Sequence, residues 1–365
     1  MSTRLRKGVA LTTKMPKNHK VGASGGRVTS YTIAKAVNVS QSTVSLVLSG
    51  KAGKRVAPAT QALIIKTARD LGYQRNEIAR VLRTGSTHLL ALAVPNVEQP
   101  FFSQVLAAAE LEARENGYSV ILLGTTTDPE WPDRLCSMIA SRQIAGCIVY
   151  AADDASEPRL AAIRENAIFI EAEDAGRSCV DLDILDGIQQ VVGHLATLGH
   201  RQIGYFAADY DKAAYHRRYD AFCAIAEAQG LVHFAEWRAK AIFALEAATE
   251  AAAALLKTQR FTALVCDDDL LAAGVYRAAR RLGMRIPEDL SVVGFDDIEL
   301  ARALAPELTT VAIPADKIGQ IAVRLLVDHI QNENAEPNPP HLIKLSLVIR
   351  GSTAAPPGQS GQQGQ

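Results

Sequence analysis

The sequence predicts an all-helical N-terminal module followed by a two-lobed α/β core with parallel sheets. Residues 28–72 form short helical segments separated by polar turns, whereas residues 89–350 alternate short apolar strands with amphipathic helices. That alternation is typical of parallel strands joined by crossover helices. Charge changes sign between the two regions. Residues 1–88 hold sixteen Lys or Arg and two acidic residues, and the rest of the chain holds 23 basic and 37 acidic residues.

A basic module beside an acidic core is typical of proteins that bind a polyanion, because each Lys or Arg placed on a phosphate releases condensed counterions. A solvated basic tail without function would give the same count. The first carboxylate of the chain is Asp70. Residues 1–27 lack hydrophobic periodicity and are expected to be a disordered basic extension; residues 353–365 are expected to be a disordered low-complexity tail.

The sequence shows neither a membrane span nor a secretion signal. No apolar run approaches the roughly 20 residues that cross a bilayer, and Val9-Ala10-Leu11 is too short for the core of a signal peptide. We therefore expect a cytoplasmic protein without a membrane partner.

The helical module opens with a helix, a tight turn and a second helix. Residues 32–37 carry apolar side chains at helical spacing, with small Ala34 where another helix must approach. Asn38 suits a left-handed turn, and Ser40 suits the N-cap of a helix over residues 41–48. A generic helical hairpin would show the same pattern. The polar side chains of the second helix, which suit base edges or phosphates in a DNA major groove, are Gln41, Ser42, Thr43 and Ser45.

Two further helices follow. Residues 58–71 predict a helix that ends at Gly72-Tyr73, and residues 76–83 predict a short one with Ala79 and Leu82 on one face, among arginines. An apolar pair ringed by arginines fits a wedge that unstacks a base step in the minor groove. A linker helix docked on the core is the alternative.

The core strands follow from short apolar runs, at residues 89–94, 120–123, 147–150, 168–170, 203–206, 264–266 and 292–295. Helices between them stop at glycine, as at Leu282-Gly283, because glycine accepts the left-handed conformation that ends a helix. The two groups of strands predict two similar lobes. An apolar helix over residues 316–330 predicts that the chain crosses between the lobes more than once.

The residue patterns of enzymes and metal sites are missing from the sequence. The five cysteines are scattered singly and are expected to be reduced thiols. No HExxH motif and no glycine-rich phosphate loop occurs. Asp267-Asp268-Asp269 fits an acidic cap at a strand-to-helix junction better than a metal site. We expect neither an enzyme nor a metal or cofactor.

Several motifs occur in the order and spacing of one family. They are VTSYTIAKAVNVSQSTVSLVLSG at 28–50, ARDLGYQRNEIARVL at 68–82, PFF at 100–102, HLATLGHRQIGYF at 194–206, DDDLLAAGVYRAARRLGMRIPEDLSVVGFDD at 267–297 and LTT at 308–310. Over residues 28–352 the chain resembles the LacI/GalR family of bacterial transcription regulators.

The resemblance implies a helix-turn-helix headpiece at 28–73, a hinge helix and linker at 74–88, and an effector-binding and dimerisation core at 89–352. The core is expected to resemble periplasmic binding proteins, with two Rossmann-like parallel-sheet lobes. Lobe 1 is expected at about 89–185 and 316–332, and lobe 2 at about 186–315 and 340–352.

The resemblance also implies the residues that contact DNA. Gln41 and Ser42 should touch base edges, Tyr31 the backbone, and Leu82 should intercalate. The full expected set is Tyr31, Ser40, Gln41, Ser42, Thr43, Ser45, Asn76, Ala79 and Leu82. Two departures matter: Leu46 stands where the family commonly has a base-reading Arg, and Thr32 where it commonly has an acidic residue.

In the core, ligands of such proteins bind between the lobes. Arg218 matches an arginine that clasps effector oxygens, and Asp296 a carboxylate that receives effector hydroxyl or N–H groups. An alternative stays open for each residue. Arg218 fits a surface residue of a helix, and Asp296 fits a cap at the end of a strand. Ile313 stands where a polar effector contact is common. The expected effector-binding residues are Phe101, Phe102, Lys212, Arg218, Phe243, Asp268 and Asp296.

The resemblance thus implies a DNA-binding transcriptional regulator, most often a repressor in this family. Its expected partners are near-palindromic double-stranded DNA, a second copy of the chain (with a tetramer left open) and a small-molecule effector such as a sugar or sugar derivative. It would work in the cytoplasm, at the nucleoid. The alternative is a small-molecule binding protein without direct gene regulation.

Overall fold

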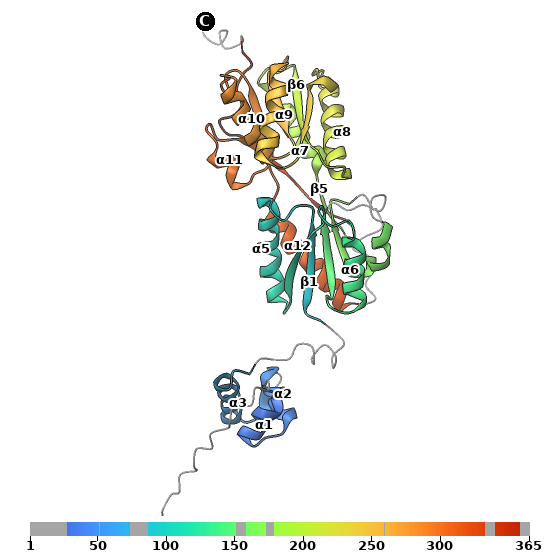
Figure 1. Cartoon of the computed structure of the whole chain (residues 1–365), viewed down its shortest axis with the longest axis vertical. Coiled ribbons are helices and arrows are strands. Elements are labelled where there is room, and N and C mark those ends of the chain that lie inside the picture. Colours follow the sequence, from blue (N-terminus) through green and yellow to red (C-terminus); the bar gives the residue numbers. More distant parts are fainter. Residues whose placement is uncertain are drawn as a thin grey trace, which may run out of the picture. The chain divides into compact units, whose positions relative to one another are not determined.

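The computed structural model describes residues 28–50, 52–73, 87–150, 158–172, 179–258, 260–332 and 340–357. The chain divides into two units, Met1–Thr84 and Gly85–Gln365. Among the described residues, the first unit contains helices alone, and the second contains all the strands together with helices of its own (Figure 1). Within the described residues, no helix is both long enough and apolar enough to cross a membrane.

The first unit is a three-helix headpiece. It consists of α1 (Ser30–Val37), α2 (Gln41–Leu48), the short 3-10 helix η1 (Gly53–Arg55) and α3 (Pro58–Asp70). Asn38 ends α1 with a left-handed backbone (φ 56°), and the Ser40 hydroxyl accepts a hydrogen bond from the Thr43 amide at 3.1 Å. The helix-turn-helix expected from these residues is therefore present. Its small core consists of Ile33, Ala34, Val44, Val47, Ala52, Ile64 and Ala68.

Lobe 1 of the second unit is built on a six-stranded sheet in the order β11-β5-β4-β3-β1-β2. The strands are β1 (Leu89–Val94), β2 (Ser119–Gly124), β3 (Gly146–Tyr150), β4 (Ala167–Ile170), β5 (Cys179–Leu182) and β11 (His341–Ile343). The helices are α5 (Pro100–Glu115), α6 (Trp131–Ala140), the 3-10 helix η2 (Pro158–Asn166) and α12 (Ala315–Gln331). Alternate residues of β1 face opposite helical layers, as Leu90 packs with α5 and α12 and Ala91 packs with α6.

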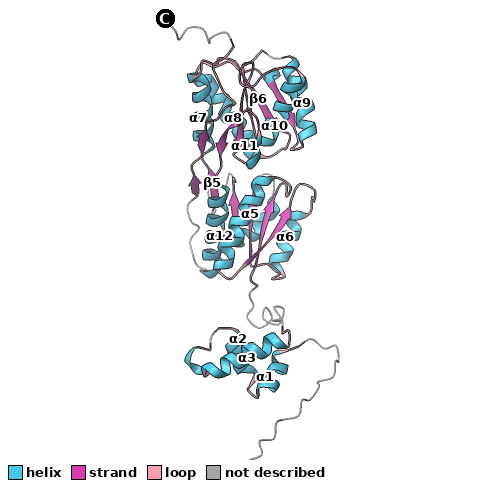
Figure 2. Ribbon diagram, turned by 90° about the vertical axis from the view of Figure 1, so that its left-hand side faces the viewer, coloured by secondary structure: helices cyan, strands magenta, loops and turns pink. Residues whose placement is uncertain are grey.

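Lobe 2 repeats the design with a six-stranded sheet in the order β12-β10-β9-β8-β6-β7. The strands are β6 (Ile203–Ala208), β7 (Arg238–Ala241), β8 (Ala263–Cys266), β9 (Ser291–Asp296), β10 (Thr309–Ala312) and β12 (Ser346–Val348). The helices are α7 (Ile184–Thr197), α8 (Ala213–Ala228), η3 (Ala235–Trp237), α9 (Leu245–Lys257), α10 (Asp269–Arg281) and α11 (Glu299–Ala303). Helices α7 and α8 pack together, and so do α9 and α10 (Figure 2). All strand pairs of the two sheets are parallel except β10 with β12.

The chain crosses between the lobes three times, after β5, after β10 and after β11. Two details differ from the sequence expectation. Residues 340–352 are expected wholly in lobe 2, whereas β11 pairs with β5 of lobe 1. Thr353 and Ala354 are expected in the disordered tail, but the Thr353 hydroxyl bonds the His194 ring and the Ala354 carbonyl oxygen bonds the His200 ring, both at 2.9 Å.

Candidate functional site

The headpiece presents one polar helix face to solvent. Val44 and Val47 of α2 are buried, while Gln41, Ser42 and Ser45 are exposed on the same helix. This division follows from helical spacing, because the apolar residues must face α1 and α3. The exposed face therefore consists of the short polar side chains that the sequence predicts for base contacts.

The start of α1 lies against this face. The Gln41 amide donates to the Ser30 hydroxyl at 2.9 Å, and Tyr31 is 65% exposed. Thr32 and Thr29 form a reciprocal capping box, so the Thr32 hydroxyl replaces an acidic side chain at the helix start.

Three of the expected DNA contacts, Ser40, Ser42 and Thr43, form local hydrogen bonds in the headpiece. The Ser40 hydroxyl caps α2 and lies 2.7 Å from the Ser42 hydroxyl and 2.8 Å from the Thr43 hydroxyl. Leu46, in the position of the missing arginine, is partly buried against the headpiece core. Asn76, Ala79 and Leu82 lie outside the described residues.

A cleft lies between the two lobes of the core, at the carboxyl ends of their parallel strands. The cleft brings together six of the seven residues expected to bind an effector, namely Phe101, Phe102, Arg218, Phe243, Asp268 and Asp296. Lys212 does not line it; that residue is the N-cap of α8.

Other residues of the cleft were missed by sequence reasoning: Gln99, Tyr150, Glu171, Tyr215 and Asp267. The position of two of them in the sequence could have indicated this role. Tyr150 ends β3 and Glu171 directly follows β4, and the carboxyl ends of parallel strands are where ligand crevices form. Gln99 directly precedes the Phe101-Phe102 motif, but nothing in the sequence indicates that its amide reaches the other lobe. Ile313, where a polar contact is common in the family, also lines the cleft.

Aromatic rings form an apolar wall on each lobe. Phe102 meets the Tyr150 ring edge-on, with centroids 4.9 Å apart, and Phe101 lies edge-on to both of these rings. In lobe 2, Phe243 packs against Tyr215 with centroids 5.9 Å apart. Such walls suit the apolar faces of a small ring.

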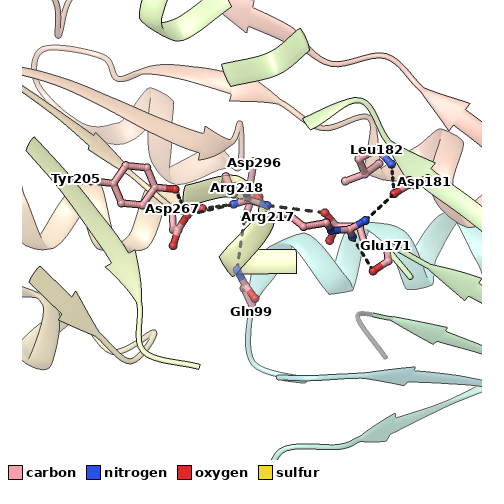
Figure 3. Close-up of polar contacts among 9 residues, drawn as sticks. All are labelled: Gln99, Glu171, Asp181, Leu182, Tyr205, Arg217, Arg218, Asp267 and Asp296. Carbon is pink, nitrogen blue, oxygen red and sulfur yellow. Dashed lines mark hydrogen bonds and ion pairs between the residues drawn. The ribbon is translucent and has the colours of Figure 1, made fainter. Parts of the chain in front are cut away.

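Arg218 is the buried cation of the cleft. Its Nη1 donates to the backbone oxygen of Asp267 at 2.5 Å, and its guanidinium lies 3.8 Å from the centroid of the Phe295 ring. The carboxylate oxygens of Glu171 and Asp267 are 3.9 and 4.0 Å from its nitrogens (Figure 3). Burial opposes the charge, but these carboxylates outweigh it and raise the pKa of Arg218. The alternative interpretation of Arg218 as a surface residue of a helix is wrong, because Arg218 is only 4% exposed.

The three consecutive aspartates have three different tasks. Asp268 caps α10 by accepting from the Leu271 amide at 2.8 Å. Asp267 accepts from the Tyr205 hydroxyl at 2.5 Å and the Ala208 amide at 2.8 Å. Asp269 accepts from the Thr310 hydroxyl and the Ile298 amide. The sequence predicts that all three aspartates cap the helix. Only Asp268 does so, whereas Asp267 and Asp269 accept hydrogen bonds from other segments of lobe 2.

Acidic side chains outnumber basic ones in the cleft. Glu171, Asp267, Asp268 and Asp296 are all buried beside the single Arg218. Burial raises the pKa of Asp268 to about 6, and burial together with the nearby Asp268 raises that of Asp296 well above its ordinary value. Burial also raises the pKa of Glu171, although Arg218 opposes this.

We predict that replacing Asp268 with asparagine makes the core more stable, by an amount that depends on pH. A carboxyl whose pKa is raised on folding stabilises the folded state below its unfolded pKa and loses this contribution as pH rises through its folded pKa. The change in the pKa of Asp268 from 3.8 to about 6 corresponds to roughly 3 kcal/mol of folding free energy. The stability difference between the Asp268→Asn variant and the parent should therefore grow between pH 4 and pH 7. Urea unfolding at several pH values measures it, and a constant difference would contradict the prediction.

Three polar atoms of the cleft are buried without a hydrogen-bond partner among the described residues: Gln99 Oε1, Glu171 Oε1 and Arg218 Nε. Two are acceptors and one is a donor. A buried polar atom without a partner costs free energy, and in native proteins it often marks a place where a ligand or water binds. Within the described residues no group of His, Cys, Asp and Glu side chains is arranged to hold a metal ion.

Family models match both units. Residues 31–76 match the model described as "Bacterial regulatory proteins, lacI family", and residues 192–353 match "Periplasmic binding protein-like domain". The chain is 33% identical to the HTH-type transcriptional regulator MalR of Streptomyces coelicolor, over 90% of this chain and 98% of that protein. It is 29% identical to the HTH-type transcriptional repressor CytR of Escherichia coli, over 89% of this chain and 96% of that protein.

Solved structures show the same architecture. The lac repressor dimer bound to operator and the anti-inducer ONPF is 25% identical, with a TM-score of 0.80, and the match covers 90% of this chain and all of that one. The transcriptional regulator CelR in complex with cellobiose is 26% identical, with a TM-score of 0.67, and the match covers 89% of this chain and all of that one.

Proposed function

Since the chain belongs to the LacI family of bacterial regulatory proteins, we propose that it is a transcriptional repressor that binds a near-palindromic operator as a homodimer. The exposed polar face of α2 carries this proposal. Gln41, Ser42 and Ser45 project from a helix whose opposite side is held by the headpiece core. A two-fold pair of such helices reads two half-sites about one helical turn apart.

The second part of the proposal is that a small-molecule effector in the interlobe cleft controls operator affinity. The partnerless atoms Gln99 Oε1, Glu171 Oε1 and Arg218 Nε support it. The surplus of acceptors over donors favours a neutral ligand with several hydroxyl groups, such as a sugar or sugar derivative, and the aromatic walls favour a ring. The solved relative CelR is in complex with cellobiose, a ligand of this kind.

Effector control requires that ligand binding and DNA binding share a conformational equilibrium. Gln99 and Glu171 stand on lobe 1 and Arg218 on lobe 2, so a ligand that bonds all three changes the relative energies of lobe arrangements. The coupling free energy of such systems is typically about 1–3 kcal/mol. Leu82, which lies outside the described residues, remains the proposed intercalating residue.

We predict that Gln41→Ala weakens operator binding by roughly 1–3 kcal/mol, the usual size of a base contact, while binding to unrelated DNA stays unchanged. Fluorescence anisotropy with the DNA flanking the protein's own gene, against scrambled DNA of equal length, measures both. Leu63→Ala is the matched control, because Leu63 is a half-exposed side chain on α3 that belongs to no predicted DNA contact.

Adding sugars and sugar derivatives to the same anisotropy experiment tests effector control. One of them should change operator affinity by about tenfold, in line with the coupling above. Absence of any specific DNA binding at low salt, with or without these ligands, would contradict the regulator function and favour a ligand-binding protein alone.

A further inference from the structure

The side chain of Gln99 joins the two lobes. Gln99 precedes α5 on lobe 1, and its Nε2 donates to Asp268 Oδ2 on lobe 2 at 2.8 Å. The same Nε2 lies 3.4 Å from Asp296 Oδ2, also on lobe 2 (Figure 3). Asp268 caps α10 and Asp296 ends β9, so both carboxylates are held by the frame of lobe 2. One amide of lobe 1 therefore binds a pair of carboxylates that belong to the other lobe.

The orientation of this amide is determined by the carboxylates. Turning the amide by 180° would place its oxygen against two carboxylate groups, which is electrostatically unfavourable. Gln99 is 6% exposed, does not cap its own helix with its side chain, and leaves Oε1 without a partner among the described residues. Its buried side chain makes its strongest hydrogen bond across the cleft, because that bond joins an N–H to a charged or readily charged acceptor.

The same two carboxylates are the acceptors that the proposed effector needs. An NH₂ group that donates both hydrogens offers the same pattern as two neighbouring hydroxyl groups of a polyol. Gln99 thus fills a donor position that a ligand would otherwise take. A ligand has to share or replace that position.

Resting on the proposed function of the cleft, we propose that Gln99 is a lobe-spanning latch that holds the unliganded core closed through Asp268 and Asp296 and that an effector must displace from them. The latch affects the net free energy of ligand binding, because the ligand must break the hydrogen bonds of the Gln99 amide before it forms its own. The latch predicts selectivity for ligands that offer two adjacent donors, since a single donor cannot replace both bonds of the amide.

The test follows hydrogen–deuterium exchange of the full chain without ligand or DNA. In Gln99→Leu the cleft segments 96–105 and 266–272 should exchange about tenfold faster than in the parent, because hydrogen bonds to charged groups shift an opening equilibrium by about that factor. Gln104→Leu is the matched control, since Gln104 is exposed on the same helix. Unchanged exchange in Gln99→Leu, or an equal increase in Gln104→Leu, would overturn the latch.

A second variant separates a latch from a merely structural role. In Gln99→Glu the introduced carboxylate faces Asp268 and Asp296, with Asp267, Asp269 and Arg218 behind them on lobe 2 and Glu171 and Tyr150 on lobe 1. At pH 8 like charges should open the cleft and accelerate exchange of both segments about tenfold. Near pH 5.5 a proton shared between carboxyl groups should restore protection, after correction for the intrinsic pH dependence of exchange.

Exchange of the central strands β1 and β9 reports whether the variants remain folded. Faster exchange that spreads through these strands would overturn the proposal, because Gln99 would then support the whole core instead of its closure. So would a Gln99→Glu variant whose corrected exchange does not change with pH. Since the experiment uses neither operator nor effector, its failure is distinct from failure of the proposed regulatory function.

Discussion

Replacing Arg218 with methionine is expected to lower the free energy of unfolding of the core by about 3–5 kcal/mol at pH 8. Methionine fills much of the same space but removes the positive charge that lies about 4 Å from Glu171 and Asp267. Both carboxylates are at most 4% exposed, so water cannot solvate them instead. Removing one partner of a buried charged group costs more than the pair contributes, because the other charge stays buried.

The pH dependence identifies the cause of this loss. Burial already raises the pKa of Glu171 and of Asp267, and Arg218 opposes that rise at both. Without the guanidinium their pKa values should rise further. Protonation at pH 5 then removes much of the uncompensated charge, so the loss of stability in Arg218→Met should be clearly smaller at pH 5 than at pH 8.

Urea unfolding followed by tryptophan fluorescence measures the effect. The two tryptophans are Trp131 of lobe 1 and Trp237 of lobe 2, both buried, so the signal reports the core and not the headpiece. Arg217→Met is the matched control. Arg217 is only partly buried, and its guanidinium donates to the Glu171 carbonyl oxygen at 3.0 Å, so about 1 kcal/mol is expected. Equal losses in both variants, or no dependence on pH, would contradict the role of Arg218.

Local rules predicted the headpiece well because its structure is determined within a few residues. Asn38 is left-handed, Ser40 caps α2, and Gly72 ends the third helix with φ 64°. The glycines expected to stop core helices, such as Gly283, also have positive φ. Each of these choices depends on one side chain and its own backbone, which the sequence displays directly.

The missed features depend on distant parts of the chain. β11 has only three residues, two of them exposed, and its pairing with β5 spans about 160 residues of sequence. Gln99 meets Asp268 across 169 positions. Asp267 and Asp269 look like cap residues in the sequence because their real partners, Tyr205 and Thr310, come from other strands. The family motifs and the positions of the strand ends therefore located the cleft, but not the contacts that close it.

The second large effect is expected at Gly319, where α12 packs against α5. A Cβ atom at this position would lie 2.8 Å from the Ala109 amide nitrogen, 3.0 Å from Ala108 Cβ and nearer still to the Val105 carbonyl oxygen. Two of these atoms belong to the backbone of α5, so no side-chain rotation relieves the contact. Gly319→Ala must separate the helices, and we expect it to destabilise the core by about 3 kcal/mol or more, despite the roughly 1 kcal/mol that alanine gains in a helix.

Gly193→Ala is the matched control for this substitution. Gly193 also lies within a helix, α7, but a Cβ atom there would meet nothing within 4 Å. The control should therefore show only the helix preference and stabilise the core by about 0.5–1 kcal/mol. Urea unfolding with the tryptophan signal should thus move in opposite directions for the same chemical change at the two positions. Two shifts of the same sign would contradict close helix packing as the cause.

The separation of α12 from α5 should also change the structure of the cleft. Helix α5 begins at Pro100, so its first turn carries Phe101 and Phe102, and Gln99 directly precedes it. A helix pushed outward at Val105 moves this turn away from the carboxylates of lobe 2. Gly319→Ala should therefore accelerate hydrogen exchange of segments 96–105 and 266–272, as Gln99→Leu does, while DNA binding by the headpiece to unrelated sequences persists. Unchanged exchange at the cleft in a destabilised variant would show that the position of Gln99 does not depend on this helix pair.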